Sequence, residues 1–234
     1  MGSILYYEES GSGFPLILLH GNGESCEYFV HQVAHYEKFF HVIALDTRGQ
    51  GKSPRGMTEY TINQFAEDVH EFMEEHQIAK AHVLGFSDGG NIAVTFALKY
   101  PQMVEKLILD GANIFPEGVE QDFLDRVEFA YARECRKAKE GPDEESRARA
   151  KAYAERLRLM IREPQIQPEE LAVLTMPVLV IAGTEDIILE DHTKLIADSL
   201  PDGKLVWIKG DHFIARDNPD DFNAAVDEFL GIKK

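Results

Sequence analysis

Short apolar runs recur along the chain and are separated by stretches that contain glycine and charged residues. These runs cover residues 15–19, 42–45, 81–84, 107–109, 178–181 and 205–208. Uninterrupted runs of this length are typical of strands that are buried on both faces of a sheet. A weaker alternation over residues 4–8, followed by Gly11-Ser12-Gly13, predicts a hairpin that leads into the strand at 15–19.

Amphipathic segments lie between several of these runs. Residues 61–76 carry apolar side chains at helical spacing, namely Ile62, Phe65, Val69, Phe72 and Met73. A further helix is expected near residues 219–230, after the last strand run. Alternating buried strands and helices predict an α/β fold, with a mostly parallel, doubly wound sheet that helices cover on both faces.

One connection, between the runs at 107–109 and 178–181, is too long for a single crossover helix. Two groups of apolar residues in it fall at helical spacing, and Gly141-Pro142 separates them. The first group is Phe123, Val127, Ala130 and Tyr131, and the second is Tyr153, Leu157, Met160 and Ile161. We expect these apolar faces to pack onto the rest of the protein, with a few side chains lining a substrate pocket.

The predicted domain organisation follows from this long connection. Residues 113–176 are expected to form a helical lid, inserted into a core domain that is built from residues 1–112 and 177–234. A length of 234 residues and a hydrophobic content of 44% fit one globular domain with an insertion.

Composition and charge narrow the range of partners and locations. No apolar run approaches the roughly 20 residues that span a bilayer, and residues 1–9 lack the features of a signal peptide, so we expect a cytoplasmic protein. A formal charge of −17 disfavours nucleic acids and anionic membranes as partners. Cys26 and Cys135 lie far apart without neighbouring ligands, and are expected to be free thiols rather than a disulfide or a metal site.

The motif with the strongest chemical content is Gly85-Phe86-Ser87-Asp88-Gly89, which has the form G-x-S-x-G. It stands directly after a strand run and directly before an amphipathic stretch, which is the context in which this motif presents a nucleophile. The glycines allow a tight strand-to-helix turn, and the turn strains the backbone at the serine. We therefore predict that Ser87 is an exposed nucleophile at a helix N-terminus. Its neighbours Phe86 and Asp88 are candidate substrate contacts, and the alternative for the Asp88 side chain is that it only stabilises the helix N-terminus.

A second glycine-containing turn, His20-Gly21-Asn22-Gly23, follows another strand run. The backbone N–H groups of Asn22 and Asp88 are predicted to form an oxyanion hole, since small residues and a helix N-terminus both favour negative charge there. His20 is expected to be structural and hydrogen-bonded within its loop.

A serine hydroxyl needs an imidazole that accepts its proton, and the imidazole needs a carboxylate that fixes its tautomer. Asp186 and His212 each follow one of the last two strand runs, which places them at the sheet edge where α/β proteins collect functional residues. The order Ser87, Asp186, His212 is the order of an α/β-hydrolase triad.

The acid has rivals at this point. Asp110 also ends a strand run, and Glu185 and Asp211 are neighbours of the two candidates. His192 lies in what is expected to be the next helix, and we interpret it as a surface residue.

Residues 46–53 contain glycines and a Lys-Ser pair, but their spacing does not match a phosphate-binding loop. Because this segment follows a strand and begins with Asp46 and Arg48, we interpret it as a turn braced by hydrogen bonds and an ion pair.

Taken together, HGNG, DTRGQGKS, GFSDGG, GTED and GDH, in this order between residues 20 and 212, resemble the motifs of α/β-hydrolase-fold proteins. The resemblance is to the compact bacterial esterase and lipase-like branch, and GFSDGG is similar to the valacyclovirase-like members. It implies Ser87, Asp186 and His212 as a triad, and Asn22 and Asp88 as the oxyanion hole. The chain departs from the common pattern in starting almost at the second strand, so we expect a sheet of about seven strands rather than eight. The valacyclovirase-like members further imply that the Asp88 carboxylate favours substrates with an amine.

The predicted function is that of a serine hydrolase, a carboxylesterase that cleaves a small carboxylic ester through an acyl-enzyme intermediate. No metal or organic cofactor is implied, and the expected partner is a small ester-like molecule. Thioesterase, amidase, perhydrolase or carbon–carbon bond hydrolase chemistry on the same site stays open. The alternative from another class is a regulator that uses the pocket to bind a ligand without turnover.

Overall fold

A computed structural model describes residues 5–232 of the protein, which fold around a seven-stranded sheet. The strand order is β1-β3-β2-β4-β5-β6-β7, in which β1 is antiparallel to its neighbour and the other strands are parallel. The strands are β1 (Tyr7–Gly11), β2 (Pro15–Leu19), β3 (His41–Leu45), β4 (Ala81–Phe86), β5 (Val104–Asp110), β6 (Val178–Gly183) and β7 (Gly203–Ile208). The predicted α/β class and the mostly parallel sheet of seven strands are therefore confirmed.

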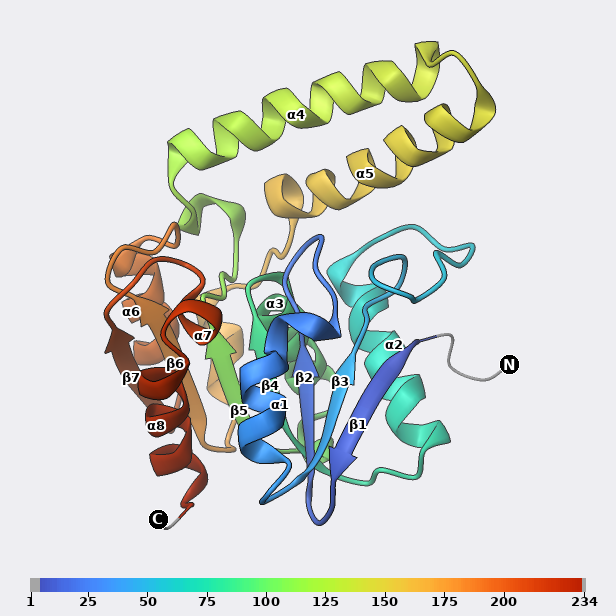
Figure 1. Ribbon diagram of the computed structural model, residues 1–234. Coiled ribbons are helices and arrows are strands. Elements are labelled where there is room, and N and C mark those ends of the chain that lie inside the picture. The colour runs from blue at the N-terminus through green and yellow to red at the C-terminus, as the bar shows by residue number, and fades with distance from the viewer. Residues whose placement is uncertain (1–4, 233–234) are drawn as a thin grey trace.

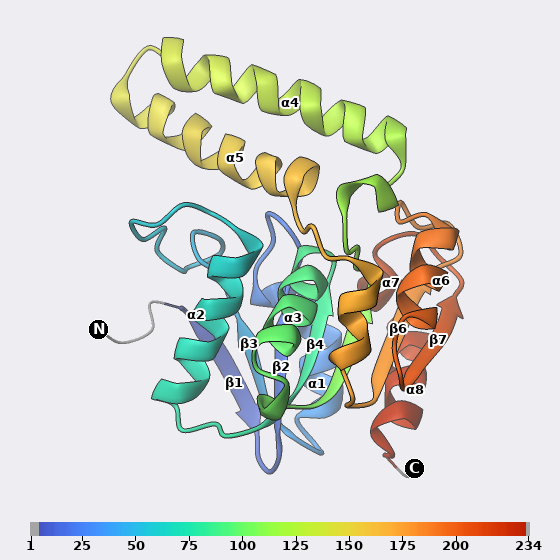
Figure 2. The same ribbon diagram turned by 180° about the vertical axis from the view of Figure 1, so that it is seen from behind.

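Helices cover both faces of the sheet (Figures 1 and 2). One face carries α2 (Ile62–Glu75), α3 (Asp88–Lys99) and α6 (Glu190–Asp198), and the other carries α1 (Val30–Tyr36), α7 (Ile214–Asp217) and α8 (Pro219–Leu230). Short 3-10 helices are η1 (Cys26–Phe29), η2 (Pro101–Met103), η3 (Pro116–Gly118) and η4 (Pro168–Val173). Ile17 and Leu19 join the first core cluster, whereas Leu16 and Leu18 join the second, because successive strand side chains point to opposite faces.

The predicted hairpin at the N-terminus is wrong. Strand β1 pairs with β3, not with β2, because both edges of β2 are occupied by its parallel neighbours β3 and β4. Gly11 and Gly13 have positive φ angles, which let the chain turn out of the edge strand β1 and pass to the interior strand β2. Residue 4, the first of the predicted strand, lies outside the described residues.

Two long antiparallel helices, α4 (Gln121–Glu140) and α5 (Glu144–Arg162), lie between β5 and β6 in the sequence and form a helical hairpin beyond the carboxyl ends of the strands (Figure 1). The helices meet at the predicted break. Gly141 follows α4, and the Asp143 side chain caps α5 by accepting the Ser146 N–H at 2.7 Å. The division into a core domain and an inserted lid stays a prediction.

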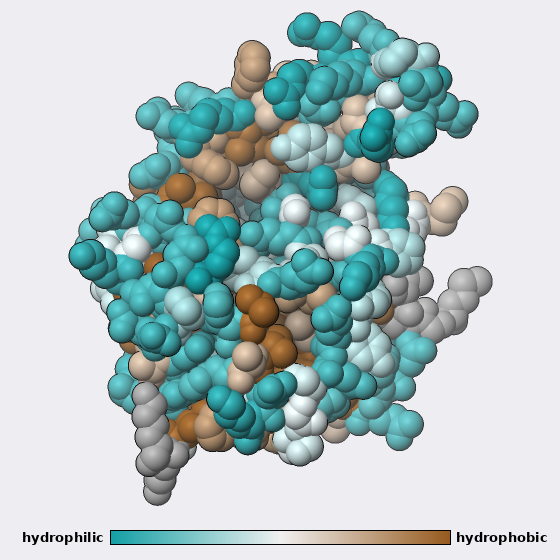
Figure 3. Space-filling view, in the orientation of Figure 1, coloured by the Kyte–Doolittle hydropathy of each residue, from teal (hydrophilic) through white to brown (hydrophobic). Residues whose placement is uncertain are grey.

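Several apolar side chains of the helical hairpin are buried, among them Leu124, Val127, Leu157 and Leu159, whereas Phe129 of α4 is 74% exposed. Leu124 of α4 is buried against Val119, which precedes α4, and Ile188, which precedes α6. In Figure 3 brown, apolar surface gathers beneath the hairpin, whereas its outer surface is mostly hydrophilic. The hairpin therefore rests on the sheet edge through a small apolar cluster.

His192 is buried, so its interpretation as a surface residue is wrong. Its Nε2 accepts the Ile114 N–H at 3.0 Å, and its ring packs against Gly118 with only 5% of the residue exposed. Burial lowers the pKa of His192 to about 4, so the ring is a neutral acceptor. The segment after β5 covers this part of α6, a contact between distant segments that helical periodicity does not reveal.

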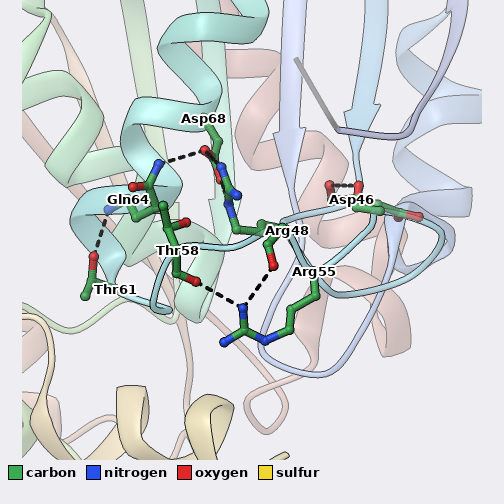
Figure 4. Close-up of polar contacts among 9 residues, drawn as sticks. Asp46, Arg48, Arg55, Thr58, Thr61, Gln64 and Asp68 are labelled. Carbon is green, nitrogen blue, oxygen red and sulfur yellow. Dashed lines mark hydrogen bonds and ion pairs between the residues drawn. The ribbon is translucent and has the colours of Figure 1, made fainter. Parts of the chain in front are cut away.

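The loop over residues 46–53 is braced as predicted (Figure 4). Asp46 accepts the Cys26 N–H at 2.6 Å and the Lys52 N–H at 2.7 Å. Arg48 donates from Nε to Asp68 of α2 at 2.7 Å and forms a second contact through its terminal nitrogen. The loop thus packs against α2 through a buried, two-point ion pair.

We predict that Asp68→Asn lowers the free energy of unfolding by about 3–5 kcal/mol, because it leaves the Arg48 charge buried without its partner. Chemical denaturation measures this change. Glu105→Gln, which removes the exposed pair with Lys80, serves as the control and should have a much smaller effect. Equal losses in both variants would contradict the prediction.

Two further features bear on earlier expectations. Cys26 and Cys135 are free thiols, as predicted. Within residues 5–232, every helix is too short or too polar to cross a membrane.

Candidate active site

Ser87 stands at the turn between β4 and α3 in a strained backbone conformation, with φ 53° and ψ −122°. A positive φ is costly for a residue with a Cβ and is found where surrounding structure enforces it. Gly85 and Gly89 make the turn possible, because a Cβ on Gly89 would lie 2.0 Å from the Leu19 carbonyl oxygen and one on Gly85 would lie 2.2 Å from the Gly89 oxygen. The strained turn that the sequence predicted is therefore present.

The structure brings Ser87, His212 and Asp186 together in one hydrogen-bonded line. His212 Nε2 lies 3.0 Å from Ser87 Oγ, and His212 Nδ1 lies 2.7 Å from Asp186 Oδ1. The same Asp186 oxygen accepts the Ile188 N–H at 2.9 Å, which fixes the carboxylate. An imidazole that donates from Nδ1 to a carboxylate leaves Nε2 free to accept the serine proton.

Asp110, the rival acid, is close to this line but not part of it. It is 0% exposed, and within the described residues neither oxygen of its carboxyl group has a hydrogen-bond partner. Burial, reinforced by the nearby Asp186 carboxylate, raises the pKa of Asp110 well above its usual range. Its backbone oxygen accepts the Ser87 N–H at 2.8 Å, so Asp110 supports the turn at Ser87 through the main chain.

The other two rivals make no hydrogen bond to the imidazole within the described residues. Glu185 is exposed, and Asp211 accepts the N–H of Phe213 at 2.8 Å instead of contacting His212. Asp186 is thus the carboxylate that the structure pairs with His212.

Gly111 is a site residue that the sequence analysis missed. It has φ +56°, and a Cβ there would lie 2.8 Å from His212 Cε1 and 3.4 Å from Asp186 Oδ2. The His212 imidazole can lie where it does only because residue 111 has no side chain. The sequence feature that could have identified Gly111 as a site residue is its place directly after the strand run that ends at Asp110.

The loop after β2 is held rigidly beside Ser87. His20 is buried, its Nδ1 lies 2.7 Å from the Gly21 oxygen, and its Nε2 accepts the Thr47 N–H at 3.0 Å. Burial lowers the pKa of His20, which keeps the ring neutral. The expectation that His20 is structural is confirmed, and its contacts fix the loop that carries Asn22.

A cavity of about 210 Å³ opens onto Ser87. Its lining comes from the β2 loop, the nucleophile turn, the segment after β5, the helical hairpin and the loops around Asp186 and His212. The lining residues are Gly21, Asn22, Glu24, Phe86, Ser87, Asp88, Asn113, Val119, Phe123, Met160, Ile187, Ile188, His212 and Phe213. Two of them are carboxylic acids and none is lysine or arginine, so the cavity is an apolar chamber with acidic positions.

Phe86 and Asp88 both line the cavity, on either side of Ser87 in the sequence. The Phe86 ring stacks on Tyr28 with centroids 4.3 Å apart and lies 4.9 Å from the His212 ring. Phe86 therefore forms an aromatic wall beside the imidazole.

Asp88 is 5% exposed, and its Oδ2 accepts a hydrogen bond from Asn22 Nδ2 at 2.7 Å. Burial raises the pKa of Asp88 to about 6, although the Asn22 hydrogen bond and the His212 charge oppose this rise. Burial likewise raises the pKa of Glu24, the second acid of the cavity. Among the described residues, no group of three or more potential ligands is placed to hold a metal ion.

Comparison with known proteins agrees with this architecture. Residues 15–160 match the model of the alpha/beta hydrolase fold family. An uncharacterized Mycobacterium tuberculosis protein is 32% identical over 104 residues, which cover 44% of this chain and only 30% of that protein's length. Lipase 3 of Moraxella sp. (strain TA144) is 26% identical over 266 residues, which cover 100% of this chain and 83% of the lipase.

A solved structure extends the similarity to three dimensions. The crystal structure of a hydrolase from Pseudomonas aeruginosa PA01 superposes with a TM-score of 0.79 at 26% identity, covering 97% of this chain and 94% of that one. The family model spans more than half of the chain, including Ser87 and both glycine turns. The protein therefore belongs to the alpha/beta hydrolase fold family.

Proposed function

We propose that this protein is a serine hydrolase that cleaves a small carboxylic ester, with Ser87 as nucleophile, His212 as general base and Asp186 as the acid that orients it. The single observation that carries the proposal is the hydrogen-bonded line from Ser87 Oγ through His212 to Asp186, at the mouth of a cavity. A serine hydroxyl next to an imidazole whose far nitrogen is hydrogen-bonded to a carboxylate is equipped for nucleophilic attack.

In the first step, Ser87 Oγ attacks the ester carbonyl carbon while His212 Nε2 takes the hydroxyl proton. Negative charge develops on the carbonyl oxygen, where the backbone N–H groups of Asn22 and Asp88 are proposed to donate hydrogen bonds. Asp88 is the first residue of α3, so its N–H belongs to the positive end of the helix dipole. The C–O bond then breaks, and the imidazolium gives its proton to the leaving alcohol.

In the second step, water attacks the acyl-enzyme after His212 has removed one of its protons. The tetrahedral intermediate collapses, Ser87 recovers its proton from His212, and the carboxylic acid leaves. Asp186 stays ionised throughout and stabilises the imidazolium that forms in each half-reaction. These steps use only groups of this chain and a water molecule.

The cavity supports a small substrate with an apolar portion. Phe123, Met160 and Val119 offer contacts to an aliphatic or aromatic acyl group, and the volume of about 210 Å³ limits its size. The experiment that tests the proposal is a panel of p-nitrophenyl esters, matching thioesters and anilides of increasing acyl length. Turnover that favours short esters supports the proposal, whereas no turnover of any acyl substrate would favour a ligand-binding regulator.

The Asp88 carboxylate is proposed to favour substrates that carry an ammonium group. It lines the cavity and is not only an acid at a helix N-terminus. A fixed anion about 5 Å from an ammonium, at an effective dielectric near 20, contributes roughly 3 kcal/mol before desolvation.

We therefore predict that Asp88→Asn lowers kcat/KM for amino-acid esters by about tenfold or more, and leaves neutral esters of equal size unchanged or faster. The substitution keeps the backbone donor and removes only the charge. Because the pKa of Asp88 is about 6, the wild-type preference for the cationic ester should be present above pH 6 and fade as the pH falls below it. Equal changes for the two esters would leave Asp88 as a helix-capping acid.

A further inference from the structure

The side chain of Asn22 makes two hydrogen bonds that its role as a backbone donor does not require. Its Nδ2 donates to Asp88 Oδ2 at 2.7 Å and to the backbone oxygen of Arg156 at 3.0 Å. A carboxamide nitrogen has two hydrogens, and both are used here. Since both neighbours are acceptors, only the NH₂ end of the amide fits this position.

These two contacts join parts of the molecule that are distant in the sequence. Asp88 is the first residue of α3 in the core, whereas Arg156 lies in the middle of α5 in the helical hairpin. Figure 1 shows the loop after β2 rising from the sheet towards α5. Asn22 is therefore a direct connection between the hairpin and a charged wall of the cavity.

Other contacts also attach α5 to the core, but they lie away from Asp88. Arg55 pairs with Glu155, and Arg158 donates to the Tyr60 backbone oxygen at 3.2 Å. Both contacts reach the loop between β3 and α2. They provide a comparison, since they attach the hairpin without touching an acid of the cavity.

We propose that the Asn22 side chain is a positioning residue that couples the placement of α5 to the charge of Asp88, and through it to the choice of substrate. The last part of this inference rests on the proposed function. With α5 in place, the Arg156 oxygen holds one amide hydrogen and thereby aims the other at Asp88. When α5 moves away, the amide loses this constraint.

The hydrogen bond from Asn22 affects the balance between the neutral and ionised forms of Asp88. Burial and the nearby Glu163 charge favour its neutral form, whereas the Asn22 hydrogen bond and His212 favour the carboxylate. A hydrogen bond to an ionised group is stronger than one to a neutral group. By reciprocity, neutralising Asp88 should weaken the connection from Asn22 to α5.

The test uses Asn22→Ala, which keeps the backbone N–H and removes both side-chain contacts. The pKa of Asp88, followed by ¹³C NMR of the aspartate carboxyl groups, should rise from about 6 by roughly one unit. Hydrogen exchange of the α5 amides should accelerate about fivefold, the effect of losing one ordinary hydrogen bond. Arg55→Ala is the matched control, which should accelerate α5 exchange without moving the pKa of Asp88.

The coupling between the charge of Asp88 and the placement of α5 is measured separately. In the wild-type protein, α5 exchange corrected for its intrinsic pH dependence should speed up as the pH falls through 6, and Asp88→Asn should abolish this step. An unchanged pKa of Asp88 in Asn22→Ala, or a pH step that persists in Asp88→Asn, would overturn the proposal. Neither measurement needs turnover, so a failure of the serine hydrolase assignment would be recognised independently.

Discussion

Replacing Ser87 with alanine is expected to lower kcat for p-nitrophenyl acetate by on the order of 10⁶, as loss of the nucleophile does in serine triads. Ser87 Oγ is the atom that lies 3.0 Å from His212 Nε2, and alanine leaves the imidazole with no hydroxyl to activate. Residual hydrolysis would come from the proposed oxyanion donors, the backbone N–H groups of Asn22 and Asp88, and from binding alone. Steady-state kinetics, with circular dichroism to check the fold, measures the effect.

A fluorophosphonate provides an independent readout of the same residue. The reagent should label the wild-type protein at Ser87, because an activated hydroxyl beside oxyanion donors traps it as a stable adduct. Ser199→Ala is the matched control, since this half-buried serine donates a hydrogen bond to the Leu195 oxygen at the end of α6. Labelling at another residue, or normal turnover in Ser87→Ala, would refute the assignment.

Much of the fold could be predicted from the sequence because local patterns of apolar residues indicate its strands. The six apolar runs became the parallel strands β2 to β7, of which β7 at the sheet edge is only half-buried. The candidate triad followed from the same logic. Ser87, Asp186 and His212 each come just after a strand, and parallel strands deliver such residues to one edge.

The structural features that could not be predicted from the sequence depend on contacts between distant segments. The pairing of β1 with β3 was missed, since alternation and glycines indicate a strand and a turn but not the partner strand. His192 looked like a surface residue until the segment after β5 was seen to cover it. The Asn22 side chain reaches across 134 positions to Arg156, a distance over which no local pattern is informative.

The sequence favoured Asp186 as the orienting acid but left Asp110 as a rival, because Asp110 ends one strand run and Asp186 follows another. In the structure, Asp186 lies 2.7 Å from His212 Nδ1, whereas Asp110 makes no side-chain hydrogen bond within the described residues. Substitutions of the two acids are therefore expected to lower kcat to different extents, although both acids are close to the same imidazole.

Asp186→Asn is expected to lower kcat by about 10⁴, because an asparagine can present its NH₂ group to Nδ1 and so favour the wrong imidazole tautomer. Asp110→Asn should have a much smaller effect. Burial raises the pKa of Asp110 well above its usual range, and neither oxygen of its carboxyl group is hydrogen-bonded within the described residues, so an amide of similar size removes no contact to the imidazole. Asp211→Asn, next to His212 but hydrogen-bonded to the Phe213 N–H, is the control for changes near the imidazole. Steady-state kinetics of the three variants measures these effects on kcat. A larger loss of kcat in Asp110→Asn than in Asp186→Asn would show that Asp110, at the end of β5, is the acid that orients His212.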